Sequence, residues 1–144
     1  MIQQREERHV LTEISTDVVF FTVRNERLCV LLIQRDKEPF ANYWSLPGGR
    51  VGRAETLDAA ARRMLAAKTG ITGVYLEQLY TFGGIERDPR GRVISVAYYA
   101  LVAAERAPLI PERPDIRWHE VEALPELAFD HAWRDATAPR RLPP

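Results

Sequence analysis

The sequence predicts an α/β fold, or α+β by some schemes: a sandwich in which helices cover both faces of a mixed β-sheet. Three observations predict it. Runs of β-branched and aromatic residues recur along the chain, one amphipathic helix with start and stop signals lies between them, and short turn-rich segments join neighbouring runs. The 144 residues, 46% of them hydrophobic, suffice for one domain with a sizeable core. We expect a single domain over residues 1–144, with a frayed tail at 137–144.

Two apolar runs near the N-terminus predict a β-hairpin. "VVFFTV" (18–23) and "LCVLLIQR" (28–35) are rich in β-branched and aromatic residues, and the short "RNER" between them suits a hairpin loop. Both runs are almost wholly apolar, which is typical of strands buried on two faces. Residues 1–15 are charged and are expected to lead into the domain. Cys29, the one cysteine, excludes an intrachain disulfide and is expected to be a small buried apolar residue.

A helix is predicted over Leu57 to Thr69, after a loop at 36–43 and a short strand, "WSLPGG", that enters a turn. Thr56 is the expected N-cap because its hydroxyl can accept a backbone N–H. Gly70 can take the left-handed conformation that ends a helix. Four residues form the apolar stripe expected to face the core: Leu57, Ala61, Met64 and Leu65.

The remaining elements follow the helix. Two strands, at 73–83 and 92–104, are predicted to be joined by "GIERDPRGR", where Pro89 and Gly91 supply turn chemistry. Residues 118–136 are expected to contain a strand end, a turn and a short last helix.

Composition narrows the class of function. Lys and Arg number 20, as do Asp and Glu, and this balance argues against strong nonspecific nucleic-acid binding. No apolar run approaches the ~20 residues of a membrane helix, and the N-terminus lacks the apolar core of a signal peptide. We therefore expect a cytoplasmic protein without a membrane partner.

The stretch "WSLPGGRVGRAETLDAAARRMLAAKTGI" resembles the signature of the Nudix family, G-x5-E-x7-R-E-U-x-E-E-x-G-U, where U is aliphatic. "LPELAFDH" near the C-terminus also resembles a family element, so the resemblance covers about residues 16–133. It implies a Nudix fold, an α/β/α sandwich around a mixed sheet, whose loop–helix–loop holds a nucleoside diphosphate linked to another group. Six signature positions fall in register: Gly49, Glu55, Arg63, Leu65, Gly70 and Ile71.

This chain departs from the signature at the positions whose glutamates would bind a metal ion. The signature's three later glutamates fall here on Met64, Ala67 and Lys68, positions that share an arc of ~100° on the helix. Three carboxylates on that arc would converge on a hard cation, which would polarise the diphosphate and activate water. A thioether, a methyl group and an ammonium are poor Mg²⁺ ligands. Glu55, the signature carboxylate that remains, is expected to be catalytic and metal-ligating only if the protein is active, with Mg²⁺ as cofactor; otherwise no cofactor is expected.

Two glycines and a lysine are the first candidates for contacting phosphate. The backbone amides of Gly48 and Gly49 can approach a phosphate, although the pair can equally serve only a turn. Lys68 is either a helix C-terminal cation favoured by the dipole or a phosphate ligand on the arc of the missing glutamates. Met64 is expected in the core because it continues the apolar stripe.

Further candidates flank the expected site. Arg35 and Trp44 suit contacts with a diphosphate and a base, respectively, although either can be ordinary surface or packing. The resemblance implies that Arg63 orients signature glutamates; with these absent its role is open, and Arg63 and Glu86 are also candidates for binding the ligand or its phosphates. Glu77 and Glu86 are carboxylates outside the signature that a rearranged active site would recruit, Glu86 first.

A narrower resemblance concerns the ligand. "YLEQLYTFG" and "RDPRGRVISVAYYALV" are similar to the Nudix-like ligand domain of bacterial regulators of NAD metabolism and to their ADP-ribose-hydrolysing relatives. This similarity implies an ADP-ribose-like ligand and a homodimer. Those regulators also carry a C-terminal winged helix of ~60 residues, for which this chain has no room, so no nucleic-acid partner is expected from this chain alone.

Three functions remain open from sequence. The first is a module that binds an ADP-ribose-like nucleoside diphosphate derivative with little or no hydrolysis, which the joint loss of three carboxylates favours. The second is a Mg²⁺-dependent hydrolase of such compounds, which the retained frame and Glu55 favour. The third is an inactive fragment or decaying copy of a regulator.

Overall fold

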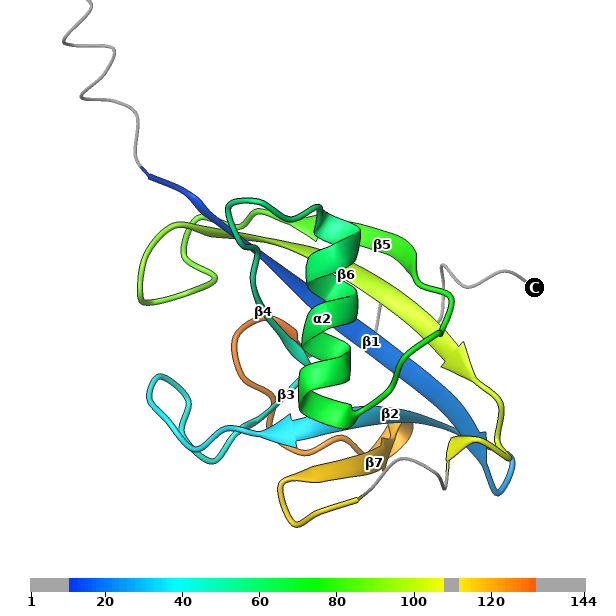
Figure 1. The fold of residues 1–144 in the computed structure, drawn as a ribbon. Helices are drawn as coiled ribbons and strands as arrows, with labels where there is room; N and C mark the ends of the chain where they lie inside the picture. The colour runs from blue at the N-terminus through cyan, green and yellow to red at the C-terminus, as the bar shows by residue number, and fades with distance from the viewer. Residues whose placement is uncertain (1–10, 108–111, 132–144) are drawn as a thin grey trace, which may run out of the picture.

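The protein's structure, a computed structural model, describes residues 11–107 and 112–131. Figure 1 shows helix α2 lying across one face of a twisted mixed sheet. Among the described residues, no helix is long and apolar enough to cross a membrane. The elements are β1 Glu13–Arg24, β2 Arg27–Gln34, β3 Trp44–Ser45, β4 Gly48–Arg50, α2 Leu57–Thr69, β5 Glu77–Phe82, β6 Val93–Val102, β7 Ile116–Glu120 and the 3-10 helix η2 Val121–Ala123.

The sheet combines both strand directions, as predicted. Its order is β3-β2-β1-β6-β5, with β4 also paired to β1 and β7 to β2. Strands β1 and β6 run parallel, whereas β1–β2 and β5–β6 are antiparallel. The predicted first hairpin is confirmed, and its two turn residues, Asn25 and Glu26, have φ of 51° and 64°. Such a turn matches the twist of the two strands.

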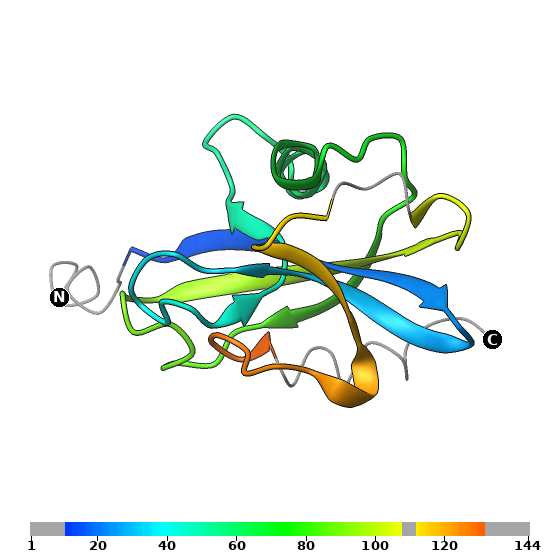
Figure 2. The same cartoon turned by 90° about the horizontal axis from the view of Figure 1, so that it is seen from below.

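The core occupies both faces of the sheet. On one face, Val18, Phe20 and Leu31 pack with Ala61 and Leu65 of α2. On the other face, alternate residues of the same strands form a second cluster, against which Val121, Leu124 and Leu127 pack. Figure 2 shows the segment that follows β7 on this face of the sheet, opposite α2. This arrangement confirms the prediction from the unbroken apolar runs. The expected short last helix and frayed tail fall on residues 132–144, outside the described part.

Helix α2 has the predicted bounds because its end signals are local. Thr56 Oγ1 accepts the Ala59 N–H at 3.1 Å, and Gly70, with φ of 77°, donates its N–H to Ala66 O at 2.8 Å. Leu65 is buried as expected. The prediction for Met64 was wrong: this residue is half-buried and belongs to neither core cluster, because its side chain lies over Gly49 of β4 and lines a cavity there.

Strands β1 and β2 separate at the end away from their hairpin. Near the turn they pair directly from Phe21↔Val30 to Arg24↔Arg27. Farther along, residues 44–50 lie between them, with β3 paired to β2 and β4 paired to β1. We call residues 44–50 the inserted segment. Strand β1 therefore begins at Glu13 instead of near 18, because its polar first residues pair through the backbone with β4 and β6.

Candidate functional site

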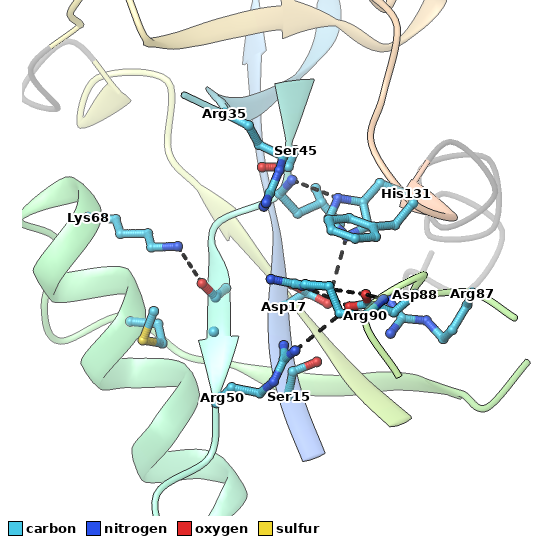
Figure 3. A pocket seen from close by; sticks show the side chains of 15 residues that line it. Ser15, Asp17, Arg35, Ser45, Arg50, Lys68, Arg87, Asp88, Arg90 and His131 are labelled. Atoms are coloured by element: carbon cyan, nitrogen blue, oxygen red, sulfur yellow. Dashed lines mark hydrogen bonds and ion pairs between the residues drawn. The ribbon is translucent and has the colours of Figure 1, made fainter. Parts of the chain in front are cut away.

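A cavity of about 390 Å³ opens beside the inserted segment, where β1 and β2 are apart (Figure 3). It draws residues from β1, β4, α2, the β5–β6 loop and the segment after η2. We call it the cationic cavity, because five cationic side chains against two carboxylates leave three positive charges in excess among its described lining residues. The cations are Arg35, Arg50, Lys68, Arg87 and Arg90, and the carboxylates are Asp17 and Asp88.

Two glycines form the strand that crosses the cavity. Gly48 and Gly49 lie in β4, so of the two interpretations left open by the sequence the simple turn does not apply to either residue. A Cβ atom on Gly48 would lie 2.0 Å from Asp17 Oδ1, and one on Gly49 would lie 2.3 Å from Met64 Cε. At Gly48 a Cβ atom would also lie 2.5 Å from the backbone oxygen of Thr16, so this position requires glycine, whereas at Gly49 the flexible Met64 side chain would have to move. Both glycines thus let β4 pass between a buried carboxylate and the helix.

Lys68 points from the helix to the cavity wall. Its ammonium donates to the carbonyl oxygen of Gly48 (Figure 3). Burial lowers the pKa of Lys68, with the nearby Asp17 charge opposing and the Arg35 charge adding to this effect. An anion entering the cavity would favour the charged form of this amine.

Asp17 and His131 form the inner wall. Ser95 Oγ donates to Asp17 Oδ2, and His131 Nε2 lies 3.9 Å from the same oxygen. The Leu46 N–H donates to His131 Nδ1 at 3.0 Å. Because Nδ1 accepts, a neutral ring carries its proton on Nε2, which faces Asp17. The ring is therefore positioned as a donor toward Asp17 and not as a base for a nucleophile.

The β5–β6 loop adds a network of arginines and aspartates. Asp88 has a side chain 2% exposed and accepts from Arg90 at 2.8 Å. Burial raises the pKa of Asp88, but hydrogen bonds and charge from Arg90 outweigh burial and hold it below its ordinary value. Arg87, also buried, donates to both carboxylate oxygens of Asp130 at 3.1 Å. This loop is thus fixed with its guanidinium groups along the cavity.

Phe129 brings an aromatic ring to the same place. The guanidinium carbons of Arg35 and Arg90 lie 4.9 Å and 5.3 Å from its ring centroid, within cation–π range. Phe129 itself has φ of 55°, an uncommon conformation for a bulky residue. Burial, together with the charge of Arg90, lowers the pKa of Arg35. The cavity therefore offers both a flat apolar surface and planar cations.

The structure brings together only some of the residues expected from sequence. Arg35, Gly48, Gly49 and Lys68 all line the cationic cavity. Trp44 does not line it: its ring packs edge-on against His119 at 4.6 Å. Glu86 is exposed in the loop beside Arg87 and is likewise outside the lining. Glu77 accepts a hydrogen bond from Tyr99 at 2.9 Å, on β5.

The Glu55 carboxylate is hydrogen-bonded to Arg63 and to the backbone of Gly52. Arg63 donates to its two carboxylate oxygens at 2.5 and 2.9 Å, and the Gly52 N–H donates to it at 2.6 Å. Hydrogen bonds from Arg63 and then Gly52 lower the pKa of Glu55 to about 2. The pair closes the loop before α2.

The Mg²⁺ that the resemblance to the Nudix signature implies does not fit these residues. No group of three or more His, Cys, Asp or Glu that could hold a metal occurs among the described residues. Glu55 is already bound to Arg63, and the helix arc toward the cavity presents Met64 and Lys68. A hard cation at this place would meet an ammonium group where it requires oxygen ligands.

Sequence reasoning missed more than half of the cavity lining. The pattern of "RDPRGR" predicts a turn from its proline and glycine, whereas its density of arginine is the signal that indicates an anion site. The residues next to Asp17 in the sequence gave no signal, because its neighbours across the sheet are known only from the pairing of β1 with β4 and β6. The missed residues include Ser15, Asp17, Arg50, Arg87, Asp88, Arg90, Phe129 and His131.

Comparisons of the sequence with known proteins identify the family of the chain. A sequence model described as the NUDIX domain matches residues 12–142. The ADPR responsive transcriptional repressor NtrR of Acinetobacter baylyi is 41% identical over 122 residues, covering 81% of this chain and 49% of the relative. The ADP-ribose pyrophosphatase of Methanocaldococcus jannaschii is 33% identical over 102 residues, covering 71% and 60%. The chain thus spans about half to three fifths of the length of these curated relatives.

A solved structure extends the similarity to three dimensions. The NUDIX domain of Shewanella oneidensis NrtR, complexed with ADP ribose, superposes with a TM-score of 0.81 and 33% identity. The match covers 95% of this chain and 92% of that domain.

Proposed function

Because the chain belongs to the Nudix family, we propose that it binds ADP-ribose or a closely related nucleoside diphosphate derivative, with little or no hydrolysis. The observation that carries this proposal is the excess of three positive charges around β4, at the place where the family holds its metal. A diphosphate carries the complementary charge, and arginine and lysine donors can bind it directly. The repressor and the ADP-ribose complex among the relatives support the choice of ligand.

The free energies expected for catalysis and for binding favour binding over cleavage of the ligand. Enzymes commonly lower a barrier by ~8–23 kcal/mol, and electrostatic stabilisation of the developing charge is a main contribution in phosphate chemistry. Losing the metal ligands would remove several kcal/mol of that stabilisation, hence several decades in rate. Binding depends less on the metal, because cations on the protein replace it.

The second candidate is a hydrolase similar to ADP-ribose pyrophosphatase. The observations that favour it are the retained pair Glu55–Arg63 and the relative of that name. In that case Mg²⁺ would be recruited by carboxylates outside the signature, and Glu86, on the loop beside the cavity, is the first such residue. The third function is an inactive fragment or decaying copy of a regulator. The cationic cavity argues against it.

Calorimetry with ADP-ribose, in the presence of Mg²⁺ and in the presence of a chelator, tests the proposal, together with chromatography of the mixture for AMP and ribose 5-phosphate. We expect binding of similar strength in both conditions and no steady formation of products. Absence of binding in both conditions would overturn the proposal. Steady turnover that requires Mg²⁺ would establish the hydrolase instead.

We further propose that the protein acts in the cytoplasm as a homodimer. Two large apolar side chains, Tyr75 and Leu101, are 77% and 62% exposed. The pairing of Glu77 with Tyr99 places them close together, since each lies two residues beyond that pair. An exposed apolar pair, with Leu101 on β6 and Tyr75 just before β5, is a suitable centre for a symmetric contact.

A further inference from the structure

A second cavity, also of about 390 Å³, adjoins the cationic cavity and shares Arg35, Ser45 and Lys68 with it. We propose that this second cavity holds the sugar at the far end of the ligand, so that the diphosphate lies against Lys68 and Arg35 between the two cavities. The nucleoside end then lies in the cationic cavity, where Phe129 offers an aromatic surface. This inference rests on the proposed function and specifies which part of the ligand each cavity binds.

The outer wall of the second cavity is fixed by backbone hydrogen bonds. Arg113 and Ile116 exchange N–H···O bonds of 3.0 Å in each direction, which closes a tight turn before β7. The Gln34 N–H donates to Asp115 O at 2.8 Å and ties this turn to β2. The wall is therefore held in place by the same pairing that joins β2 and β7.

The charges of this cavity suit a neutral polyhydroxyl group better than a further phosphate. Apart from the shared Arg35 and Lys68, its lining has two cations and two carboxylates among the described residues, so these charges balance. Arg113 Nε and Asp115 Oδ1 lie 3.9 Å apart, and the two side chains are 60% and 58% exposed. Such an exposed pair is weak, and both partners can turn to ligand hydroxyls. The two carboxylates are Asp36 and Asp115, and the two cations are Lys37 and Arg113.

The cavity depends on a small residue at one helix position. Ala67 is exposed on α2 and lines the second cavity but not the cationic cavity. A longer side chain there would project into the space assigned to the sugar. Methionine is the suitable replacement, because it adds volume without charge and favours the helix.

The test is a comparison of two ligands on three proteins. ADP-ribose and ADP are titrated by calorimetry into the parent, into Ala67→Met and into Ala59→Met. Ala59 is exposed on the same helix and lines neither cavity, so its variant is the matched control. We expect Ala67→Met to weaken ADP-ribose binding about tenfold, equivalent to ~1.4 kcal/mol, and to leave ADP binding within about twofold of the parent. Ala59→Met should change neither.

The measured quantity is the ratio of the two affinities in each variant divided by the same ratio in the parent, so that the difference in charge between the two ligands cancels. An equal loss for both ligands in Ala67→Met, or no loss for either, would overturn the assignment of the sugar while the proposed binding of ADP-ribose stands. If the parent binds neither ligand, the proposed function and this inference both fail. Retained ADP binding also shows that the variant is folded.

Discussion

Lys68 occupies the place where the family's signature has a glutamate, and its partner in the structure is a backbone carbonyl, that of Gly48. A helix C-terminal cation without a binding role would extend into water; this one is drawn inward, and burial lowers its pKa. We take its ammonium to be a donor to the ligand's diphosphate.

Lys68→Ala should therefore weaken ADP-ribose binding roughly tenfold or more, since a charge-assisted hydrogen bond contributes about 1.5–3 kcal/mol. Calorimetry at fixed ionic strength measures the loss, and added salt should weaken the parent more than the variant. Arg53→Ala, which removes an exposed cation outside both cavities, is the control. If Lys68→Ala binds as tightly as the parent, Lys68 is only a helix-end cation.

The same residue predicts a pH dependence. A lysine whose pKa is lowered from 10.5 by burial is protonated below the lowered value and loses its charge as pH rises through it. The contribution of Lys68 to the affinity is therefore fully present at low pH. As the pH rises, this contribution is lost at a lower pH than an exposed lysine would lose its charge, while the arginines stay charged. Titration of ADP-ribose from about pH 7.5 to about pH 10 should show this decline in the parent and not in Lys68→Ala. A decline of the same size in both proteins would assign it to another group.

At the scale of elements, Glu55 and Arg63 join the loop before α2 to the helix. The pKa of Glu55, lowered from 4.5 to about 2, means that the folded state prefers the ionised carboxylate. Its stabilisation is present above pH 4.5 and is lost as pH falls from there toward 2.

Glu55→Gln should accordingly lower the Tm at neutral pH, and the difference from the parent should shrink below pH 4.5. Thermal unfolding followed by circular dichroism measures both. Asp58→Asn, which removes a more exposed carboxylate paired with Arg62 on the same helix, should have a smaller effect. A Tm difference that does not change with pH would show that the ionised carboxylate is not the cause.

Elements with local signals were predictable, and elements defined by distant partners were not. The ends of α2 follow from Thr56 and Gly70, which act on backbone groups a few residues away. The inserted segment between β1 and β2 has no such signal, because its position depends on pairing with two strands at once. The candidate site divides in the same way: the signature and the segment just before it located Gly48, Gly49 and Lys68, whereas Asp17 and His131 meet only through the fold.

At the scale of the whole molecule, the exposed pair Tyr75 and Leu101 predicts how two copies associate. Leu101→Lys should produce monomers, because a charge at the centre of an apolar contact is costly to bury. Light scattering across the micromolar range measures the mass of parent and variant. Val23→Lys replaces another exposed apolar residue, 45% exposed on β1, and tests whether the contact is specific to the pair. A monomeric parent would contradict the dimer.

The inserted segment also limits how this frame can diversify. Strands β1 and β2 diverge from their shared hairpin, and the inserted segment sets the distance between them at the end away from the hairpin. Where β4 meets Asp17, the inserted segment already has a glycine, Gly48, and no other residue has a smaller side chain. Substitution at Gly48 can therefore only push the strands farther apart. Descendants of this chain can gain room for bulkier ligands by that route, but they cannot tighten the gap around smaller ones.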